Sequence, residues 1–249
     1  MAKAGERLLD VLEAINKLGA CTIMELHVAT GLSRQAIYRI VEVLTKTGFT
    51  DYISGTNRVR LTSKVLLLSI GYRADNALRD AAQEAVDKLQ SDIGWPTSVS
   101  VYEGGAMVVV HTTQHRSPYV FTVGGIGLRL PILESAMGLA YLSFSQSKRR
   151  RMILDLLFQD QSRQDKARSI KTIELTAKKA REVGYCVRQG GIGQTTTSIA
   201  LPLMKGEEVC GALCATFLHS ALRLDQARKK LLPRLTDARK MAEANLMRQ

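Results

Sequence analysis

Apolar residues recur at helical spacing through the first fifty positions of the chain. The first such set predicts a helix that ends at Gly19, where a left-handed residue would close it. A second, short helix begins at Thr22, because Thr22 and Glu25 have the spacing of a capping box. A third helix is capped by Ser33 and ends near Gly48. The apolar positions behind these predictions are Leu8, Leu9, Leu12, Ile15, Leu18, Ile37, Ile40, Val41 and Leu44.

The pattern changes to a two-residue period after the third helix. Apolar and basic residues alternate from Arg58 to Leu61, and the turn-forming residues 54–57 precede them. Alternation of this kind predicts a strand, and a strand after such a turn predicts a hairpin. Short helices followed by a hairpin are the order of elements in a winged helix-turn-helix. Residues 1–62 are therefore expected to form a DNA-binding domain.

The rest of the chain combines helical and strand patterns. Residues 63–93 return to helical spacing and predict a linker helix. From residue 94 onward, strand-like runs and helical segments predict an α+β domain over residues 94–249. Its expected strands are 98–102, 106–111, 196–203 and 208–217, and its expected helices are 135–144, 148–158, 172–183 and 225–247.

Composition narrows the class of protein only in part. The 249 residues are 45% hydrophobic, and their formal net charge of +12 is spread along the chain, so charge supports nucleic-acid binding only weakly. The four cysteines lack CxxC spacing and the N-terminus lacks an apolar leader, which predicts reduced thiols in a cytoplasmic protein. No apolar run approaches the roughly 20 residues needed to cross a bilayer, so no membrane partner is expected.

The third helix commits one face to the core and presents groups that suit DNA on the other. Arginine can donate a bidentate pair to guanine, glutamine can pair with adenine, and hydroxyls can reach phosphate. The residues predicted to face the major groove are Ser33, Arg34, Gln35, Tyr38 and Arg39. Those predicted to meet phosphate or the minor groove from the hairpin are Thr56, Asn57, Arg58 and Arg60. The alternative is a helical bundle with an ordinary polar surface.

Five segments stand in a fixed order along the chain. They are LSRQAIYRIVEVLTKTGFTDY, RVRLTSKVLLLSIGY, GLRLPILESAMGLAYLSF, REVGYCVRQG and TTSIALPL. Together they resemble the IclR family of bacterial transcription regulators, and residues 95–121 are most similar to activators of hydroxyphenylpropionate catabolism and related aromatic-acid pathways. The resemblance implies a GAF-like effector-binding domain, a homodimer or homotetramer, and control of a catabolic operon. Operator DNA, a small-molecule effector and RNA polymerase are the implied partners.

The resemblance also implies an effector pocket. Its residues, carried over one by one, are Ala136, Met137, Arg188, Ser198, Cys214 and Thr216. Many members of the family have an acidic cluster around the position of Arg188, and an arginine there can clamp an anionic ligand. Apolar residues near these positions suit an aromatic ring, so an aromatic or phenolic acid is the expected effector. The alternative is that Arg188 pairs with a structural carboxylate and the ligand is a small keto acid.

Other classes of protein fit the sequence less well. No GxSxG elbow or adjacent base accompanies Ser135, Ser198 or Cys214, so no enzyme is expected. His111 and His115 lie four residues apart without the further ligands that a metal site needs, and no cofactor motif is found. A nucleoid-type protein that binds DNA without sequence preference stays as the alternative from a different class, although such a protein has no use for a pocketed second domain.

Overall fold

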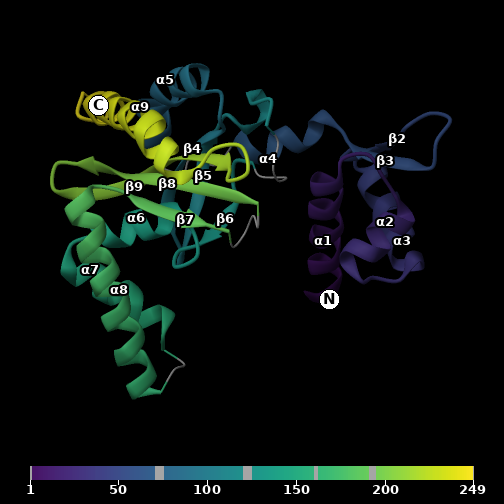
Figure 1. Cartoon of the computed structure of the whole chain (residues 1–249). Coiled ribbons are helices and arrows are strands. Elements are labelled where there is room, and N and C mark those ends of the chain that lie inside the picture. The colour runs from purple at the N-terminus through teal and green to yellow at the C-terminus, as the bar shows by residue number, and fades with distance from the viewer. Residues whose placement is uncertain (1, 71–75, 120–124, 160–161, 191–194, 249) are drawn as a thin grey trace. The chain divides into compact units, whose positions relative to one another are not determined.

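The chain folds into two compact units, Met1–Ala74 and Asp75–Gln249. Figure 1 draws the first in purple and blue and the second in colours from blue-teal to yellow. Each unit has a hydrophobic core of its own. The computed structural model describes residues 2–70, 76–119, 125–159, 162–190 and 195–248.

The N-terminal unit consists of short helices and a small antiparallel sheet. The helices are α1 (Ala2–Leu18), α2 (Ile23–Thr30) and α3 (Arg34–Lys46), and the strands are β1 (Cys21–Thr22), β2 (Thr50–Tyr52) and β3 (Arg58–Leu61). A 3-10 helix, η1 (Ser63–Leu66), and one turn of helix, α4 (Leu67–Ile70), follow. The strand order is β1-β3-β2, with β3 antiparallel to both neighbours. The predicted succession of three helices and a hairpin is present.

Two predicted helix caps are confirmed in this unit. The Thr22 hydroxyl accepts a hydrogen bond from the Glu25 amide at 3.2 Å, and the Glu25 carboxylate accepts one from the Thr22 amide at 2.7 Å. This capping box starts α2. The Ser33 hydroxyl accepts a hydrogen bond from the Ala36 amide at 3.3 Å and starts α3. Both caps bond groups three residues apart, which is why the local sequence was enough to predict them.

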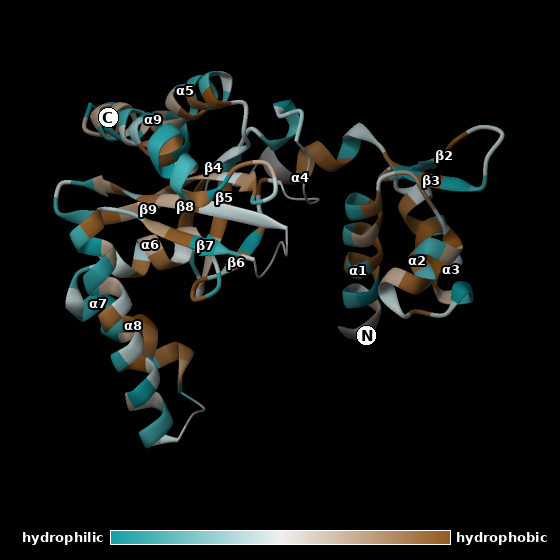
Figure 2. Ribbon diagram, viewed as in Figure 1, coloured by the Kyte–Doolittle hydropathy of each residue, from teal (hydrophilic) through white to brown (hydrophobic). Residues whose placement is uncertain are grey.

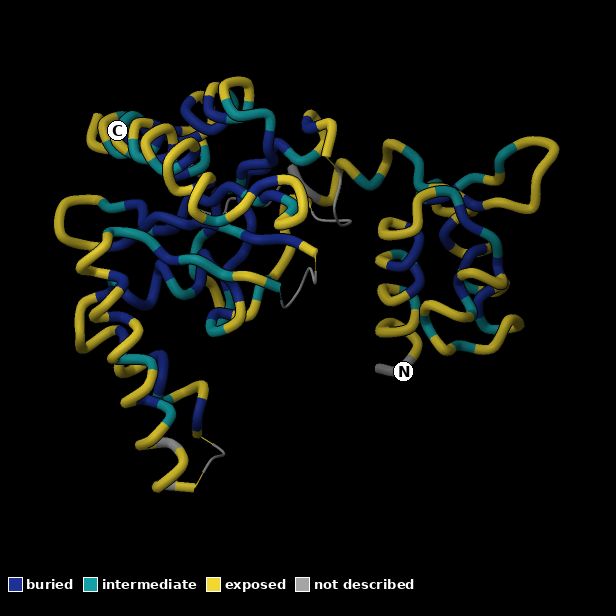
Figure 3. Tube along the Cα trace, in the orientation of Figure 1, coloured by how far each residue is buried: buried dark blue, intermediate teal, exposed yellow. Residues whose placement is uncertain are grey.

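The apolar faces of the three helices meet in one core, which Figure 3 draws in dark blue. Its fully buried members include Val11, Ile15, Leu26, Ile37, Val41 and Val59. Val59 belongs to β3, so the hairpin is fixed to the same core as α3. The opposite face of α3 is left at the surface.

The C-terminal unit is built around a six-stranded antiparallel sheet. Its strands are β4 (Thr97–Glu103), β5 (Ala106–Thr112), β6 (Arg129–Pro131), β7 (Cys186–Gln189), β8 (Thr196–Lys205) and β9 (Glu208–Leu218). They lie in the order β6-β5-β4-β9-β8-β7. The helices are α5 (Asn76–Ile93), α6 (Ala136–Phe144), α7 (Ser147–Leu157), α8 (Arg163–Val183) and α9 (Leu224–Leu246), with a 3-10 helix, η2 (Gln114–Arg116). This arrangement confirms the predicted α+β class.

Helices cover both faces of this sheet. α5 and α9 pack on one face, α6 packs on the other, and α8 packs against α6. Figure 2 shows brown, apolar segments of the strands between these helices. Because strand residues alternate between the two faces, Ile199 and Leu201 pack with α5 and α9, whereas Ala200 packs with α6. The same strand therefore contributes to two different cores.

The helical linker predicted over residues 63–93 is divided between the two units. η1 and α4 belong to the N-terminal unit, and α5 belongs to the C-terminal unit. Leu78, Ala82 and Val86 of α5 are at most 3% exposed and pack in the core with α9. The amphipathic pattern of α5 reflects this packing, which helical spacing by itself does not distinguish from a free linker.

Candidate functional site

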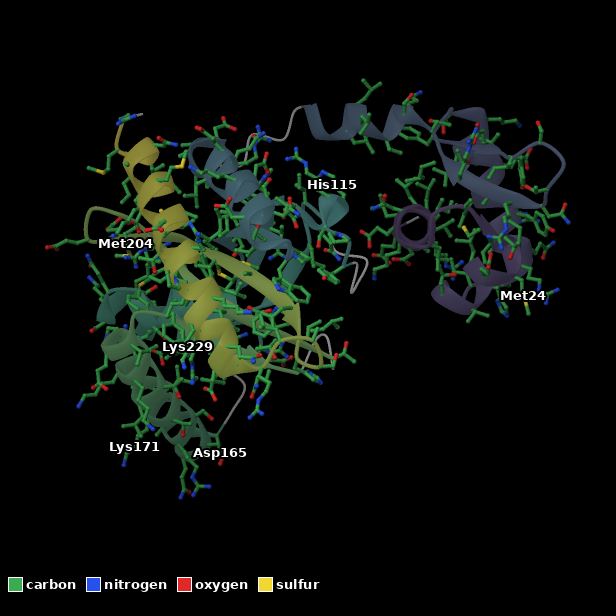
Figure 4. All side chains as sticks on the ribbon, turned by 45° about the horizontal axis from the view of Figure 1, so that its top comes forward. Met24, His115, Asp165, Lys171, Met204 and Lys229 are labelled. Atoms are coloured by element: carbon green, nitrogen blue, oxygen red, sulfur yellow. The ribbon has the colours of Figure 1, made fainter. Side chains whose placement is uncertain are left out.

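The outward face of α3 carries side chains that were predicted to contact DNA. All five are exposed, namely Ser33, Arg34, Gln35, Tyr38 and Arg39. Arg34 contacts the sulfur of Met24 at 2.9 Å, and Figure 4 labels Met24 at the surface of the N-terminal unit. Among the described residues, Gln35 and Arg39 make no side-chain hydrogen bond. Their polar groups are therefore available to a partner.

The two hairpin arginines predicted to contact DNA are held within the unit. Arg60 donates two hydrogen bonds to the carboxylate of Asp51, at 2.9 and 3.2 Å, and this pairing lowers the pKa of Asp51. Arg58 donates to the Ala20 carbonyl at 2.6 Å and to the Glu25 carboxylate at 3.4 Å. These contacts were not predicted from the sequence, although Asp51 and Arg60 are directly opposite in the hairpin register. Both arginines brace the hairpin.

The other two predicted hairpin residues, Thr56 and Asn57, lie exposed at the turn. The Thr56 hydroxyl donates to the Ile53 carbonyl at 2.9 Å and accepts from the Arg58 amide at 3.2 Å. Gly55 has a φ of 75°, a left-handed value that glycine adopts without strain. Thr56 and Gly55 therefore shape the turn, which leaves Asn57 as its outward polar side chain.

The C-terminal unit contains a cavity of about 130 Å³ between the start of α6 and the sheet. All six residues predicted to bind the effector line it, namely Ala136, Met137, Arg188, Ser198, Cys214 and Thr216. The other lining residues were not predicted from the sequence; they are Pro96, Ser98, Val109, Thr112, Gln114, Gly125, Leu128, Leu130, Ser135 and Thr196. Alternation along β4 could have grouped Ser98 with its own face of the strand, but it does not reveal which face borders a cavity.

Hydroxyl groups lie along the strands that border the cavity. The hydroxyls of Ser198 and Thr216 are 2.9 Å apart and hydrogen-bonded. Those of Ser98 and Thr112 are hydrogen-bonded at 2.8 Å. In the sheet register Arg188 is opposite Ser198, and Ser198 is opposite Thr216. Directly opposite residues of antiparallel strands share a face, so sheet pairing brings these three positions together.

α6 presents its N-terminus to the cavity. Ser135 caps the helix, since its hydroxyl accepts a hydrogen bond from the Gly138 amide at 3.0 Å. Ala136 and Met137 are the first two helical residues, so their amides have no acceptor within the helix. A side-chain carbon on Gly138 would overlap the backbone of Ile132, including its carbonyl. The absence of a side chain at Gly138 therefore allows α6 to start this close to the Ile132 backbone.

Arg188 is the only charged residue among the described residues that line the cavity. Arg188 is half-buried and makes no ion pair within the part of the chain that the structure describes. None of the described lining residues is an aspartate or a glutamate. Burial raises the pKa of the Cys214 thiol to about 11, so this thiol is neutral at pH 7 and packs as a small hydrophobic group. The lining therefore favours an anionic ligand.

Within the part of the chain that the structure describes, no group of three or more His, Cys, Asp or Glu side chains is arranged to hold a metal ion. His111 instead lies 2.9 Å from one carboxylate oxygen of Asp87 in α5, and Arg116 lies 2.9 Å from the other. Partial burial acts to raise the pKa of Asp87, but the hydrogen bonds from His111 and Arg116 outweigh it and lower this pKa.

None of the helices in the described segments is long and apolar enough to cross a membrane.

The sequence model of one protein family, described as "Bacterial transcriptional regulator IclR C-terminal", matches residues 72–243. The chain belongs to the IclR family. The resemblance that the five ordered segments indicated is thereby confirmed, and this IclR-family chain is a transcriptional regulator rather than an enzyme. Regulators of this family bind DNA and small-molecule effectors.

This IclR-family regulator is similar to proteins of several bacteria. It is 22% identical to the HTH-type transcriptional regulator TsaQ1/TsaQ2 of Comamonas testosteroni over 200 residues. This aligned region covers 79% of this chain and 70% of the relative. A transcriptional regulator of Rhodococcus sp. RHA1 matches over 98% of both chains, with a TM-score of 0.70 and 22% identity. An IclR homologue of Microbacterium hydrocarbonoxydans, crystallised with 4-hydroxybenzoate, matches over 99% of this chain and 100% of its own, with a TM-score of 0.69 and 20% identity. At these identities the solved structures show a shared fold.

Proposed function

We propose that this regulator binds operator DNA through its N-terminal unit and an aromatic acid in the cavity of its C-terminal unit. In this proposal, α2, α3 and the β2–β3 hairpin act as a winged helix-turn-helix. The observation that carries the proposal is the cavity, which the predicted effector residues line together. The effector controls transcription by binding with different affinity to two states of the protein.

The proposed DNA contact is the exposed face of α3, with Arg34, Gln35 and Arg39 as its main donors. Ser33 and Tyr38 add hydroxyls that reach phosphate. The hairpin contributes Thr56, Asn57, Arg58 and Arg60. An arginine has five N–H donors, so a guanidinium that braces the hairpin keeps donors for a phosphate oxygen. Side chains of α3 contact the base edges, and side chains of the hairpin contact phosphates and so position the protein on the DNA.

The size and charge of the cavity support an aromatic acid. Its volume of about 130 Å³ is close to that of an engineered cavity in another protein that binds benzene, about 150 Å³. Arg188 pairs with no carboxylate among the described residues, which favours an anionic ligand over a structural role for this side chain. A small keto acid would leave part of the space unfilled. The 4-hydroxybenzoate complex of the Microbacterium homologue agrees with this ligand class.

We further propose a homodimer or homotetramer that binds a partly palindromic operator beside a catabolic operon. Leu66, Leu67 and Leu68 follow the hairpin and are between 60% and 65% exposed. Adjacent exposed leucines indicate an association surface. Ligand-dependent contact with RNA polymerase and a cytoplasmic location belong to the same proposal, and both are implied by the family.

A gel-shift experiment tests this function. The purified full-length protein is mixed with its own upstream intergenic DNA and with a scrambled duplex, at fixed salt, with and without a panel of aromatic acids and keto acids. We expect retardation of the intergenic DNA alone, and a change of that retardation with one or more aromatic acids. Equal, salt-sensitive binding to both duplexes without response to any acid would contradict the proposal and indicate a nonspecific DNA-binding protein.

A pair of variants separates base reading from phosphate contact. Arg34→Ala should weaken binding to the operator by about 1–3 kcal/mol and binding to scrambled DNA much less, if Arg34 reads a base. Arg168→Ala, an exposed arginine of α8, serves as the matched control and should change neither. A uniform loss on both duplexes for Arg34→Ala would mark a phosphate contact instead.

A further inference from the structure

We propose that the effector carries two acidic groups at opposite ends of a single ring. This rests on the proposed function, because it names the ligand class of the same cavity. The cavity has two places that favour negative charge, the N-terminus of α6 and the guanidinium of Arg188. A ligand with one acidic group satisfies one of them, and an aromatic dicarboxylate satisfies both.

The first anion position is the start of α6. The Ser135 hydroxyl accepts a hydrogen bond from the Gly138 amide. Within the described chain, neither the Ala136 amide nor the Met137 amide has a hydrogen-bond acceptor. Both residues line the cavity. Free amides at a helix N-terminus carry partial positive charge and bind carboxylates. One carboxylate of the ligand therefore lies at this end.

The second anion position is Arg188 on β7. Its side chain is half-buried at the cavity, and no described carboxylate pairs with it. A partly desolvated cation without a counter-ion is costly, and a carboxylate that accepts two of its N–H groups offsets that cost. A second carboxylate therefore lies against Arg188.

The two positions lie on different sides of the cavity. The side chain of Met137 reaches β4, where its sulfur accepts a hydrogen bond from the Ser100 hydroxyl at 3.1 Å. Arg188 belongs to β7, and β9 and β8 lie between β4 and β7. Three strand steps correspond to about 14 Å, and the long arginine side chain spans part of that distance. The remaining gap suits a ring with para substituents better than one compact acid.

The space between the two positions suits a ring. Val109, Leu128 and Leu130 supply apolar lining, and Ser198 and Thr216 already hydrogen-bond to one another. Hydroxyls that are paired in this way lose little when an apolar ring edge covers them. The ring is therefore held by apolar contact, while the two carboxylates fix its orientation.

Isothermal titration calorimetry on the full-length protein tests the inference. The probes are benzene-1,4-dicarboxylate, benzoate and 4-hydroxybenzoate at matched ionic strength. We expect the dicarboxylate to bind about 10- to 100-fold more tightly than either monoacid, the range that one charge-assisted pair provides. Arg188→Gln should remove this preference and leave the affinity for benzoate nearly unchanged. Arg188→Lys should keep part of it, and Gln189→Ala, the exposed neighbour on β7, should keep all of it.

The possible failures are distinguishable. If a monoacid binds as tightly as the dicarboxylate, the two-acid inference is overturned and the proposed function stands. If no aromatic acid binds, the proposed effector class falls together with the inference. If Arg188→Gln weakens all three ligands alike, its guanidinium has a structural role, which also overturns the inference. Thermal unfolding followed by circular dichroism checks that the variants fold. The affinities of the wild-type protein for the dicarboxylate and the two monoacids test the inference without any variant.

Discussion

The two faces of the six-stranded sheet differ in the size of the side chains that the same strands present. Toward α5 and α9, β8 and β9 present Ile199, Leu201 and Phe217, which are at most 2% exposed. Toward α6, the alternate positions carry small side chains, among them Ser198 and Ala200. Large residues fill the first face, and small ones leave a space of about 130 Å³ on the second. Side-chain size at alternate positions therefore determines where the cavity lies.

The two faces of the sheet are expected to have different roles. Burial of large apolar side chains is the main source of folding free energy, so the α5/α9 face is expected to stabilise the unit. Side chains that line an empty space lack van der Waals contacts on one side, and a ligand that binds there can supply them. Substitutions on the two faces should accordingly separate stability from ligand binding.

The largest effect is expected on the packed face. Phe217→Ala removes a fully buried ring that meets Trp95 edge-on, with ring centroids 6.2 Å apart. The free energy of unfolding should fall by about 3–5 kcal/mol, from lost burial and the void left behind. Urea unfolding of the full-length chain measures it. Phe217→Leu, which keeps most of the volume, should cost much less, and equal losses for both variants would contradict the packing argument.

A smaller effect is expected where α6 begins. In Gly138→Ala the new methyl group overlaps the Ile132 backbone, so α6 must move away from it. Strain of this kind costs about 1–3 kcal/mol, and we expect ligand affinity to fall as well because the cavity wall shifts. Gly125→Ala is the control, since Gly125 lines the cavity and nothing lies within 4 Å of the added carbon. Urea unfolding and calorimetry on both variants provide the test, and similar losses for the two would refute it.

The sequence predicted those parts of the fold that local chemistry determines. The capping box of Thr22 and Glu25 and the cap by Ser33 depend on groups three residues apart. The buried face of α3 depends on helical periodicity alone. These features need no information about distant segments.

The fold features that depend on distant partners were predicted less well. α5 was expected to form part of a linker, because its pattern does not name α9 as its neighbour. α8 was expected to begin at Thr172 but begins at Arg163. The sequence from 163 to 171 is mostly polar, with Ile170 as its one buried position among the described side chains, so it offers no apolar period.

The candidate site was predicted in part for the same reason. The resemblance named six residues of the cavity, and sheet pairing brings them together. Thr112 and Val109 were missed, because the β4–β5 pairing shifts register between Val99 and Ser100. A bulge of this kind changes which residues of β5 share a face, and strict alternation does not foresee it.

A third substitution fills the cavity itself. Ser198→Leu adds apolar volume beside Arg188 and leaves the Thr216 hydroxyl without its partner at 2.9 Å. We expect a stability change of only about 1 kcal/mol, because the added side chain occupies existing space and one hydrogen bond is lost. Affinity for an aromatic acid should fall at least tenfold by calorimetry. Ser198→Ala, which loses the hydroxyl without adding volume, should retain more affinity, and the reverse order would show that the hydroxyl matters more than the space.

The smallest effect is expected at a polar contact between α5 and the sheet. The Asp87 carboxylate lies 2.9 Å from both His111 and Arg116, and its pKa is lowered below the ordinary value of 3.8. A carboxyl whose pKa is lower in the folded state stabilises the fold above its unfolded pKa, and this contribution is lost as pH falls through the folded value. Asp87→Asn should therefore cost about 0.5–1 kcal/mol at pH 7.

The difference between Asp87→Asn and the wild type should begin to shrink as the pH falls below about 3.8, where the unfolded carboxyl takes up its proton, and should vanish only below the lower pKa of the folded state. Urea unfolding at pH 7, 5 and 3 measures it, with Asp225→Asn at the start of α9 as an exposed control. A loss that is the same at all three pH values would mean that Asp87 acts through packing rather than charge. The polar contact would then belong to the same packed face as Phe217, and the contrast between the two faces of the sheet would rest on side-chain size alone.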